Sequence, residues 1–307
     1  MALERLPERI KLIRRSLCSV AEMLMADVRF RTMTLTDVDF YCRLIDMTGW
    51  GLNEMDFERM LSYEPNGCFI VSLDGEDVGM VASFLYGEVG WIGNLVTLPE
   101  HRDRGVGAAL MEKAIGRLCA EGAKSIRLDT VAKAIPLYKR LGFKPEYNSL
   151  RFRGTGQRHP ASSVSRMRSE DIEEIEMLDE SFFGADRGKM LRRVFRDFPD
   201  LCFASWRGGR IVGYVMAKRG VGIYRVGPWI CEPGHPEAAS SLLYALMNIA
   251  TGEKIWVGVH EGNEASAKIL KVNGFEQLPS SLRMCLGTCA TVEDASGIFG
   301  IGAAEKG

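Results

Sequence analysis

The chain of 307 residues carries the same pattern twice, and this internal repeat limits the folds that it can adopt. A short apolar segment, a polar turn and an acidic helix start occur around Asp37 and again around Asp171. A glycine-containing hairpin turn leads to Gly79 and again to Gly213, at the same offset that separates Asp37 from Asp171. A Gly-Phe pair closes each copy at nearly the same interval. The pattern predicts two copies of one unit of ordinary domain size.

Each copy alternates strand-like and helix-like stretches, which is typical of an α/β fold with a mixed central sheet flanked by helices. In the first copy we expect strands at 28–33, 68–73, 77–86, 91–97, 125–129 and 146–152, and helices at 35–47, 54–61, 105–120 and 134–141. The predicted division is an N-terminal extension (1–26), the first copy (27–155), a polar linker (156–163), the second copy (164–288) and a tail that frays (289–307).

The composition excludes several classes of protein. Lys and Arg number 39 and Asp and Glu number 40, so no basic face for nucleic acid is indicated. No apolar run is long enough to span a bilayer, and the N-terminal stretch lacks the apolar core of a secretory signal. The eight cysteines include no CxxC pair, which favours unpaired thiols and no metal site. We therefore expect a cytoplasmic protein without metal, nucleic-acid or membrane partners, as a monomer or a homodimer.

The strongest chemical signal lies between residues 94 and 110. An apolar run stops at Pro99, a basic glycine-containing turn follows, and then a helix begins, so Arg102-x-x-Gly105-x-Gly107 lies at a helix N-terminus. Unpaired backbone N–H groups and the positive end of the helix dipole favour an anion there, and glycine lets a phosphate approach closely. A tight turn needed only for packing is the alternative. Leu110 in place of a third glycine disfavours a dinucleotide fold, and the absence of Gly-Lys-Ser/Thr excludes a P-loop.

The first copy, over about 28–152, resembles the GNAT superfamily of N-acetyltransferases. The resemblance rests on the motif just described and on Leu137-Tyr138-x-x-Leu141-Gly142-Phe143, in that order along the chain. It implies two tandem GNAT-like domains, acetyl-CoA as co-substrate, and two strands that part beside the loop to leave a slot for the thioester. The residues implied to bind acetyl-CoA are Leu95, Val96 and Thr97 for the pantetheine arm, and Arg102, Asp103, Arg104, Gly105, Val106, Gly107 and Ala108 for the pyrophosphate.

The resemblance also implies a direct transfer without an acyl-enzyme, in which Tyr138 is the general acid that protonates the departing thiolate. From composition alone, Tyr138 would be interpreted as a core residue with its hydroxyl at the surface. Asp129, which ends the strand before the Tyr138 helix, is the first candidate for the general base. Glu88, Glu54 and Asp56 are further candidates, and each is also explained as a solvated or capping carboxylate. A water relay would serve as well.

The second copy lacks most of these groups. No Arg-x-x-Gly-x-Gly precedes its corresponding helix, where Glu232 and Glu237 would repel a pyrophosphate. Leu270 stands in the place of the tyrosine, and a leucine cannot donate a proton. Many family members carry a cofactor-contacting asparagine seven residues before the tyrosine; Asn263 keeps it, whereas Val131 replaces it in the first copy. We therefore expect that the second copy does not catalyse transfer, and that it docks on the first and walls the acceptor cleft.

These observations predict an acetyl-CoA-dependent N-acetyltransferase whose acceptor is the primary amine of a small molecule or a peptide. Two alternatives stay open: a non-catalytic sensor in which both copies bind acyl-CoA, and a scaffold whose loop is idle. Trp50, Tyr86 and Trp91 are expected to wall part of the acceptor cleft. The identity of the acceptor and the acyl chain length do not follow from the sequence.

Overall fold

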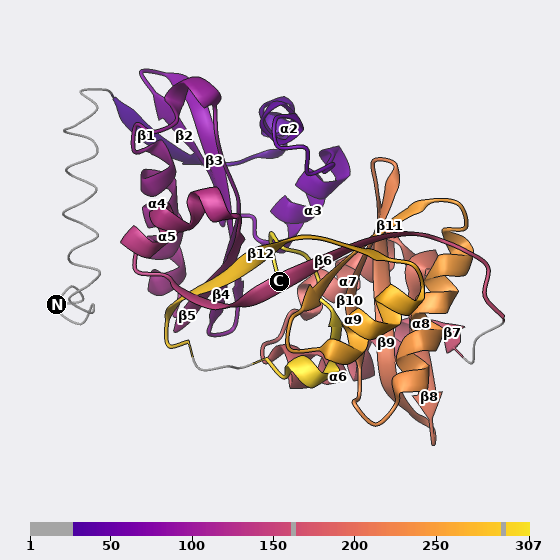
Figure 1. Cartoon of the computed structure of the whole chain (residues 1–307). Coiled ribbons are helices and arrows are strands. Elements are labelled where there is room, and N and C mark those ends of the chain that lie inside the picture. Colours follow the sequence, from indigo (N-terminus) through magenta and orange to yellow (C-terminus); the bar gives the residue numbers. More distant parts are fainter. Residues whose placement is uncertain (1–26, 161–163, 290–292) are drawn as a thin grey trace.

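The computed structural model describes residues 27–160, 164–289 and 293–307, so the predicted N-terminal extension lies outside the described residues. A continuous 13-stranded sheet runs through both halves of the molecule, in the order β1-β2-β3-β4-β5-β12-β6-β11-β10-β9-β8-β7, with β13 paired to β10. Helices pack along this sheet in each half (Figure 1). The predicted α/β architecture with two similar halves in tandem is confirmed.

The first half forms the elements that its pattern predicts. Its strands are β1 (Val28–Thr32), β2 (Cys68–Leu73), β3 (Glu76–Tyr86), β4 (Val89–Thr97), β5 (Ser125–Thr130) and β6 (Lys144–Thr155), and its helices are α2 (Val38–Asp46), α3 (Glu54–Tyr63), α4 (Val106–Ala120) and α5 (Ile135–Arg140). β2 is buried along its whole length, which explains its uninterrupted apolar run. The side chain of Asn53 accepts a hydrogen bond from the amide of Asp56 and so begins α3 as an N-cap.

The second half repeats this order. Its strands are β7 (Val164–Arg166), β8 (Cys202–Arg207), β9 (Arg210–Gly220), β10 (Ile223–Cys231), β11 (Lys254–His260), β12 (Glu276–Gly287) and β13 (Ile298–Gly300), and its helices are α6 (Ile172–Phe183), α7 (Gly188–Asp197), α8 (Pro236–Ile249) and α9 (Glu264–Val272). Gly79 pairs with Thr97 in the first half, and Gly213 pairs with Cys231 in the second. β4 and β10 are therefore related by the same offset along the chain that relates Gly79 to Gly213.

The two halves exchange their last long strands. β12 of the second half pairs antiparallel with β5, and β6 of the first half pairs antiparallel with β11. β12 and β6 also pair with each other, and Figure 1 shows them side by side across the junction between the halves. That residues 156–163 link two domains that follow one another along the chain stays a prediction. In space, each half is completed by a strand of the other.

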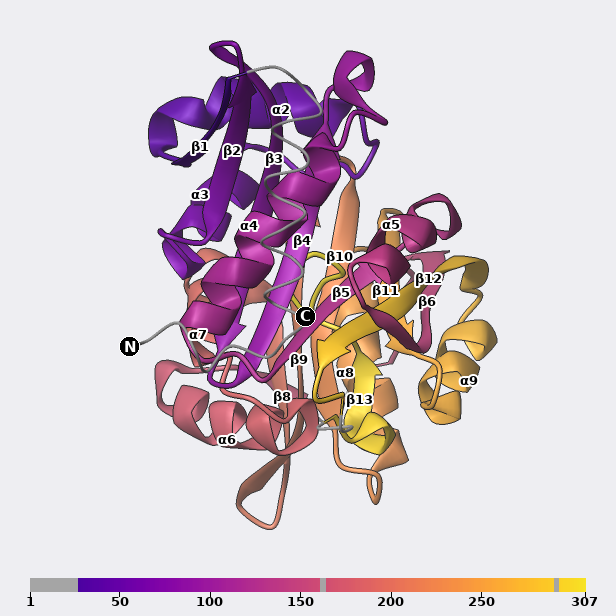
Figure 2. The ribbon, with the colours of Figure 1, turned by 90° about the vertical axis from the view of Figure 1, so that its left-hand side faces the viewer.

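The prediction that 289–307 frays is wrong for residues 293–307. β13 pairs antiparallel with β10, with Gly300 opposite Trp229 and Ile298 opposite Ile230. Lys306 is only 3% exposed, and Gly307 is buried as well. Figures 1 and 2 both place this end of the chain in the centre of the molecule, between the two halves. A Cβ atom would lie 2.2 Å from Phe182 at Gly297 and 2.1 Å from the carbonyl oxygen of Gly307 at Gly302, so these glycines fit where a larger residue would not.

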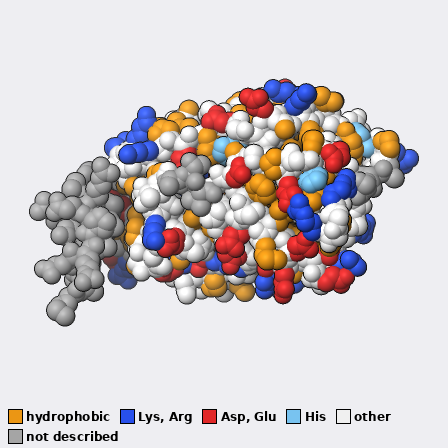
Figure 3. Space-filling model, turned by 90° about the horizontal axis from the view of Figure 1, so that it is seen from below, with side chains coloured by type: hydrophobic (Ala, Val, Ile, Leu, Met, Phe, Trp, Pro, Cys, Tyr) orange, Lys and Arg blue, Asp and Glu red, His pale blue; other side chains and the backbone are white. Residues whose placement is uncertain are grey.

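Two cysteines also differ from expectation. Cys285 and Cys289 form a disulfide at the end of β12, so the prediction of unpaired thiols is wrong for this pair. The other cysteines that the structure describes are free: Cys42, Cys68, Cys119, Cys202 and Cys231. Across 27–160, 164–289 and 293–307, no helix is long and apolar enough to cross a membrane. On the face shown in Figure 3, Lys and Arg side chains are interspersed with Asp and Glu.

Candidate active site

The site begins where β4 and β5 separate. The two strands pair in parallel from Val89 to Trp91 only, although both continue beyond that point. Asn94 has a φ of 50°, and the register of β4 against β3 shifts between Gly93 and Val96. This bulge turns β4 away from β5, because an extra residue on one strand bends it. The structure thus contains the slot that the family resemblance implied.

The loop before α4 lies at the end of β4. Asp103 has a φ of 59°, and Gly105, the N-cap of α4, has a φ of 83°. Within the described residues, the amides of 103–105 donate no hydrogen bond, and the first amides of α4, 106–108, lie in a turn that has no intrahelical acceptor. The side chains of Arg102 and Arg104 lie on the exposed rim of this loop. The arrangement is a cationic cradle suited to an anion.

Gly107 shows how closely the predicted parts meet. A Cβ atom at this position would lie 3.8 Å from Cδ2 of Leu137 on α5 and 4.0 Å from Oγ1 of Thr97 on β4. The end of β4, the start of α4 and the start of α5 therefore surround one point. Packing does not require glycine here, since both distances are ordinary contacts. The structure brings the two sequence motifs together; whether Leu95, Val96 and Thr97 bind pantetheine stays a prediction.

Tyr138 follows Leu137 on α5 and is buried, with 8% of its surface exposed. Burial raises the pKa of its phenol to about 12, and a hydrogen bond with Thr130 opposes that rise. Its ring packs edge-on against Phe143 at 6.0 Å between centroids. Thr130 ends β5 on the far side of the slot, beyond the last residue that pairs with β4. Tyr138 is thus a protonated hydroxyl held against the end of β5, and its hydroxyl does not lie at the surface.

Asp129 is fully paired. Arg283 of β12 binds it with Nε to Oδ1 and Nη2 to Oδ2, both at 3.0 Å, and the hydroxyl of Ser149 donates to Oδ1 at 2.8 Å. The side chains of Asp129 and Arg283 are each 1% exposed. Arg283 and Ser149 thus occupy both oxygens of this carboxylate with hydrogen bonds, and the ion pair is buried where strands of the two halves meet. This geometry argues against the predicted base role and assigns Asp129 to the junction of the two halves.

The same arginine joins residues that the sequence did not single out. Nη1 of Arg283 lies 3.3 Å from Oε1 of Glu293, and the hydroxyl of Tyr147 donates to Oε2 of Glu293 at 2.7 Å. The guanidinium also stacks over the ring of Trp91, 4.2 Å from its centroid. These side chains come from β12, from the C-terminal segment, from β6 and from β4. No local sequence motif predicts this cluster of side chains, because they come together only through the exchange of strands between the halves.

The remaining carboxylate candidates have structural roles. Glu88 is exposed and pairs with Lys124. Asp56 takes part in the capping of α3 and binds Nη2 of Arg59 at 2.9 Å. Glu54 lies exposed in the first turn of α3. The structure therefore supports the capping or solvated interpretation for all three.

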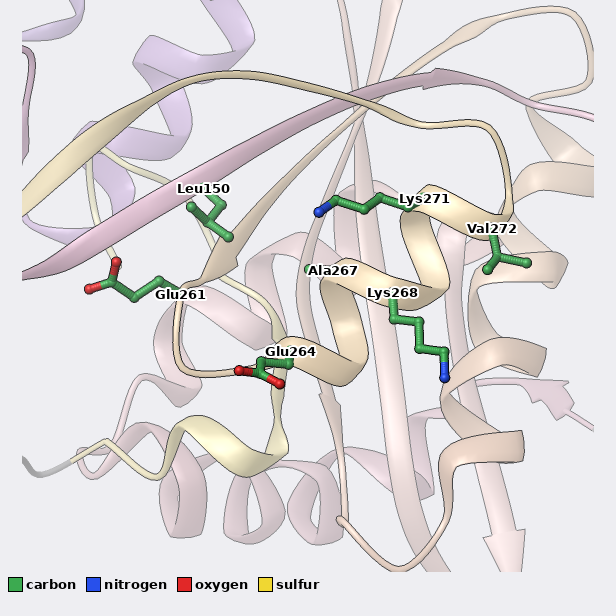
Figure 4. A pocket seen from close by; sticks show the side chains of 7 residues that line it. All are labelled: Leu150, Glu261, Glu264, Ala267, Lys268, Lys271 and Val272. Carbon is green, nitrogen blue, oxygen red and sulfur yellow. The ribbon is translucent and has the colours of Figure 1, made fainter.

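Two further observations limit the chemistry. Among the residues placed by the structure, no three His, Cys, Asp or Glu side chains converge as ligands for a metal. A surface pocket on α9 and β6 has Glu261, Glu264, Lys268 and Lys271 around it (Figure 4). None of the predicted site residues lines this pocket. The sequence motifs and the geometry therefore indicate the same site, where β4 and β5 separate.

Known proteins match this chain in both halves. Residues 38–143 match the acetyltransferase (GNAT) family, and residues 175–300 match an acetyltransferase (GNAT) domain. Holothin acyltransferase from Pseudoalteromonas sp. (strain SANK 73390) is 26% identical over 243 residues, which cover 78% of this chain and 81% of that protein. A putative acetyltransferase from Pyrococcus horikoshii superposes with a TM-score of 0.77 at 23% identity, over 91% of this chain and 96% of that one. A tandem GNAT protein from the clavulanic acid biosynthesis pathway superposes with a TM-score of 0.59 at 13% identity, over 86% and 100%. These two structures share the fold of this chain.

Proposed function

The chain belongs to the GNAT acetyltransferase family, and on that premise we propose that its first half transfers an acetyl group from acetyl-CoA to a primary amine. The acceptor is a small molecule or a peptide, the transfer is direct, and the protein acts in the cytoplasm as a monomer or a homodimer. The observation that carries the proposal is that the anion cradle, the end of β4 and the start of α5, the helix that carries Tyr138, adjoin where β4 and β5 separate. A relative named as an acyltransferase supports the class of reaction.

The residues present fit acetyl-CoA. The amides of 103–108 at the N-terminus of α4 are not used in hydrogen bonds of the described residues, Arg102 and Arg104 add positive charge, and Gly107 leaves room for a phosphate. We assign the pyrophosphate to this cradle and the pantetheine arm to the backbone of Leu95, Val96 and Thr97. When bound, acetyl-CoA supplies the activated acetyl thioester. The chain supplies binding, alignment and the handling of protons.

Tyr138 is the proton donor in this proposal. An amine that attacks the thioester carbonyl forms the C–N bond, the C–S bond breaks, and the sulfur leaves as a thiolate that needs a proton. A phenol whose pKa is about 12 stays protonated at neutral pH and can give that proton. Thr130 holds its hydroxyl at the end of β5. The phenolate is then reprotonated from solvent.

The acceptor amine reaches the slot from the side of α2 and α3. Three buried polar atoms on that side have no hydrogen-bond partner among the described residues: Oδ1 of Asn94 and the hydroxyls of Tyr41 and Tyr63. A buried polar group without a partner costs free energy, so these atoms suit an incoming ammonium or amine. Since the candidate carboxylates are paired, capping or exposed, we propose that a water relay takes the amine proton.

The test is a screen of primary amines with acetyl-CoA, monitored by release of free thiol, with Tyr138→Phe measured beside the wild-type chain. Transfer to at least one amine, strongly reduced in Tyr138→Phe, is expected. If acetyl-CoA raises the thermal stability but no amine releases thiol, the sensor alternative replaces the enzyme. If acetyl-CoA has no effect on thermal stability, the scaffold alternative gains, because a ligand of the folded state must stabilise it.

A further inference from the structure

The second half contains a counterpart of the slot. β10 and β11 pair in parallel up to Val226 and Val257 and then separate, as β4 and β5 do after Trp91. The register of β10 against β9 shifts between Val226 and Trp229, which matches the bulge of β4. By the offset that relates the two halves, Trp229 and Ile230 correspond to positions 95 and 96. These two positions bind pantetheine in the proposal for the first half.

In the second half, the chain fills this slot itself. β13 pairs with β10 at Trp229 and Ile230, and the amide of Ile301 donates to the carbonyl of Gly258 on β11 at 2.9 Å. A Cβ atom on Gly227 would lie 1.9 Å from the carbonyl oxygen of Ile301. The segment thus occupies the opening between the two strands. Its backbone makes the contacts that a pantetheine arm would make with the other half.

The asparagine kept in the second half also binds this segment. Nδ2 of Asn263 donates to the carbonyl oxygens of Ala295 and Ile298, each at 3.0 Å. The hydroxyl of Ser266, on α9, donates to the carbonyl of Phe299. Asn263 occupies the position that the resemblance links to the cofactor, yet its donors are committed to main chain here. Three independent parts of the second slot therefore hold one stretch of the protein.

The same stretch then crosses to the first half. The indole N–H of Trp91 donates to the carbonyl of Ala304 at 3.2 Å, and the hydroxyl of Tyr86 donates to the carbonyl of Lys306 at 2.8 Å. A Cβ atom on Gly93 would lie 2.1 Å from the carbonyl oxygen of Glu305. Trp91 and Tyr86 are among the residues expected to wall the acceptor cleft, and both are at most 1% exposed. Residues 302–307 cover them.

We infer that residues 302–307 form the wall of the acceptor site in the first half, and that β13, seated in the slot of the second half, holds this wall in place. The inference rests on the proposed acetyl transfer. The second half then contributes to the reaction by fixing a segment that limits the size of the acceptor. The main-chain contacts on both sides favour a fixed wall over a plug that must leave before an acceptor binds.

The charges of the segment agree with a fixed position. The ammonium of Lys306 lies 2.6 Å from Oε1 of Glu305, and both side chains are largely buried. Lys306 also lies over the ring of Tyr63, 5.8 Å from its centroid. A buried ion pair tolerates displacement poorly, because each charge would lose its partner in a poorly solvated place. The segment therefore stays in place beside the acceptor site.

The test uses a chain shortened after Gly302 and two acceptors that differ only in size, glycinamide and phenylalaninamide. In the full chain, we expect kcat/KM to favour glycinamide. In the shortened chain, we expect the ratio of phenylalaninamide to glycinamide to rise at least tenfold, with the KM for acetyl-CoA little changed. Faster hydrogen exchange at 91–94 confirms that β4 is uncovered. Lys124→Gln, which removes an exposed charge paired with Glu88, is the control and should keep the ratio of the full chain.

Tyr86→Phe is the second variant, and it decides the matter if the shortened chain does not fold. It removes the hydroxyl that binds the carbonyl of Lys306, so the ratio should change in the same direction by a smaller factor. If the ratio of phenylalaninamide to glycinamide is unchanged in a folded variant in which 91–94 exchange faster, residues 302–307 do not form the wall. A general rise of kcat for both amines overturns it too, in favour of a plug. A full chain that acetylates no amine overturns the proposed function first, and this inference with it.

Discussion

Gly93 and Gly227 occupy the same position in the two halves, and each leaves space for a carbonyl oxygen of the same C-terminal segment. A Cβ atom would lie 2.1 Å from the oxygen of Glu305 at Gly93, and 1.9 Å from that of Ile301 at Gly227. Both distances are far below any real contact, so a larger residue at either position would move the segment. One stretch of chain thus depends on equivalent glycines of β4 and β10.

Ala108 allows the anion cradle to be tested without damage to the fold. It lies in the first turn of α4 and is partly exposed. A glutamate there is favourable to the helix dipole and should stabilise the protein by roughly 0.3–1 kcal/mol. It should also weaken acetyl-CoA binding at least tenfold, because its charge repels the pyrophosphate. Ala108→Gln is the control of equal size, and calorimetry measures both affinities. Equal affinity in the two variants would contradict the cradle.

Tyr138→Phe removes the proposed proton donor and keeps the ring. We expect kcat to fall by roughly 10²–10⁴, the usual contribution of general acid catalysis, with the KM for acetyl-CoA little changed. Because the pKa of this phenol is about 12, the wild-type rate should show no alkaline loss from Tyr138 between pH 6 and pH 10. Tyr147→Phe, at another buried tyrosine, should change the stability more than kcat. Equal kcat in wild type and Tyr138→Phe would remove this residue from the mechanism.

The filled slot predicts one acetyl-CoA per chain. The first half offers the free amides of 103–108, whereas in the second half β13 occupies the strand and Asn263 is already bonded to main chain. Titration calorimetry on the full chain should give a stoichiometry of one. At a hundredfold excess over Kd, the ligand should add about 2.7 kcal/mol to the free energy of unfolding. Two equivalent sites would show that β13 leaves its slot.

Substitutions at Asp129 and Arg283 distinguish a structural role of Asp129 from a catalytic one. Arg283→Met leaves Asp129 and Glu293 buried without their cation, and should cost about 3–5 kcal/mol in the free energy of unfolding by urea. Asp129→Asn should also lower the stability while the folded fraction keeps most of its transfer rate. Loss of kcat with unchanged stability in Asp129→Asn is the opposite result, and it would restore Asp129 as the general base.

Lys218 of β9 should make the stability depend on pH. Burial lowers its pKa to about 7, and the nearby Lys306 adds to this, while Glu305 and Asp56 oppose it and Arg225 lowers it further. Between pH 7 and about 10.5 the unfolded chain holds a proton that the folded chain has lost, so this group makes stability rise with pH over that window. Lys218→Met should flatten the rise and stabilise the protein most at the low end of this window. Thermal melts from pH 6.5 to pH 9.5 measure this, and parallel curves for both proteins would contradict it.

The sequence by itself determined the local elements and the two motifs. The capping residue Asn53 and the glycine-rich turn before α4 act on residues next to them in the chain, so the sequence alone predicts them. The repeat of the whole unit is likewise detected by comparing the sequence with itself. The spacing of the loop and Tyr138 within one α/β unit was sufficient to predict that they meet. In the structure, the position of Gly107 lies against Leu137, the residue before Tyr138 on α5.

Only the tertiary structure decided how the halves are joined and what covers the acceptor side. β6 and β12 each follow a Gly-Phe pair in their own half, so no local signal specifies that the two halves exchange them. The pairing of Asp129 with Arg283, far away along the chain, follows from that exchange. In sequence, the Gly- and Ala-rich end of the chain resembles a fraying tail, because small residues give no clear hydrophobic pattern. Its order comes from hydrogen bonds of its main chain to β10, Trp91 and Tyr86, which lie far from it along the chain.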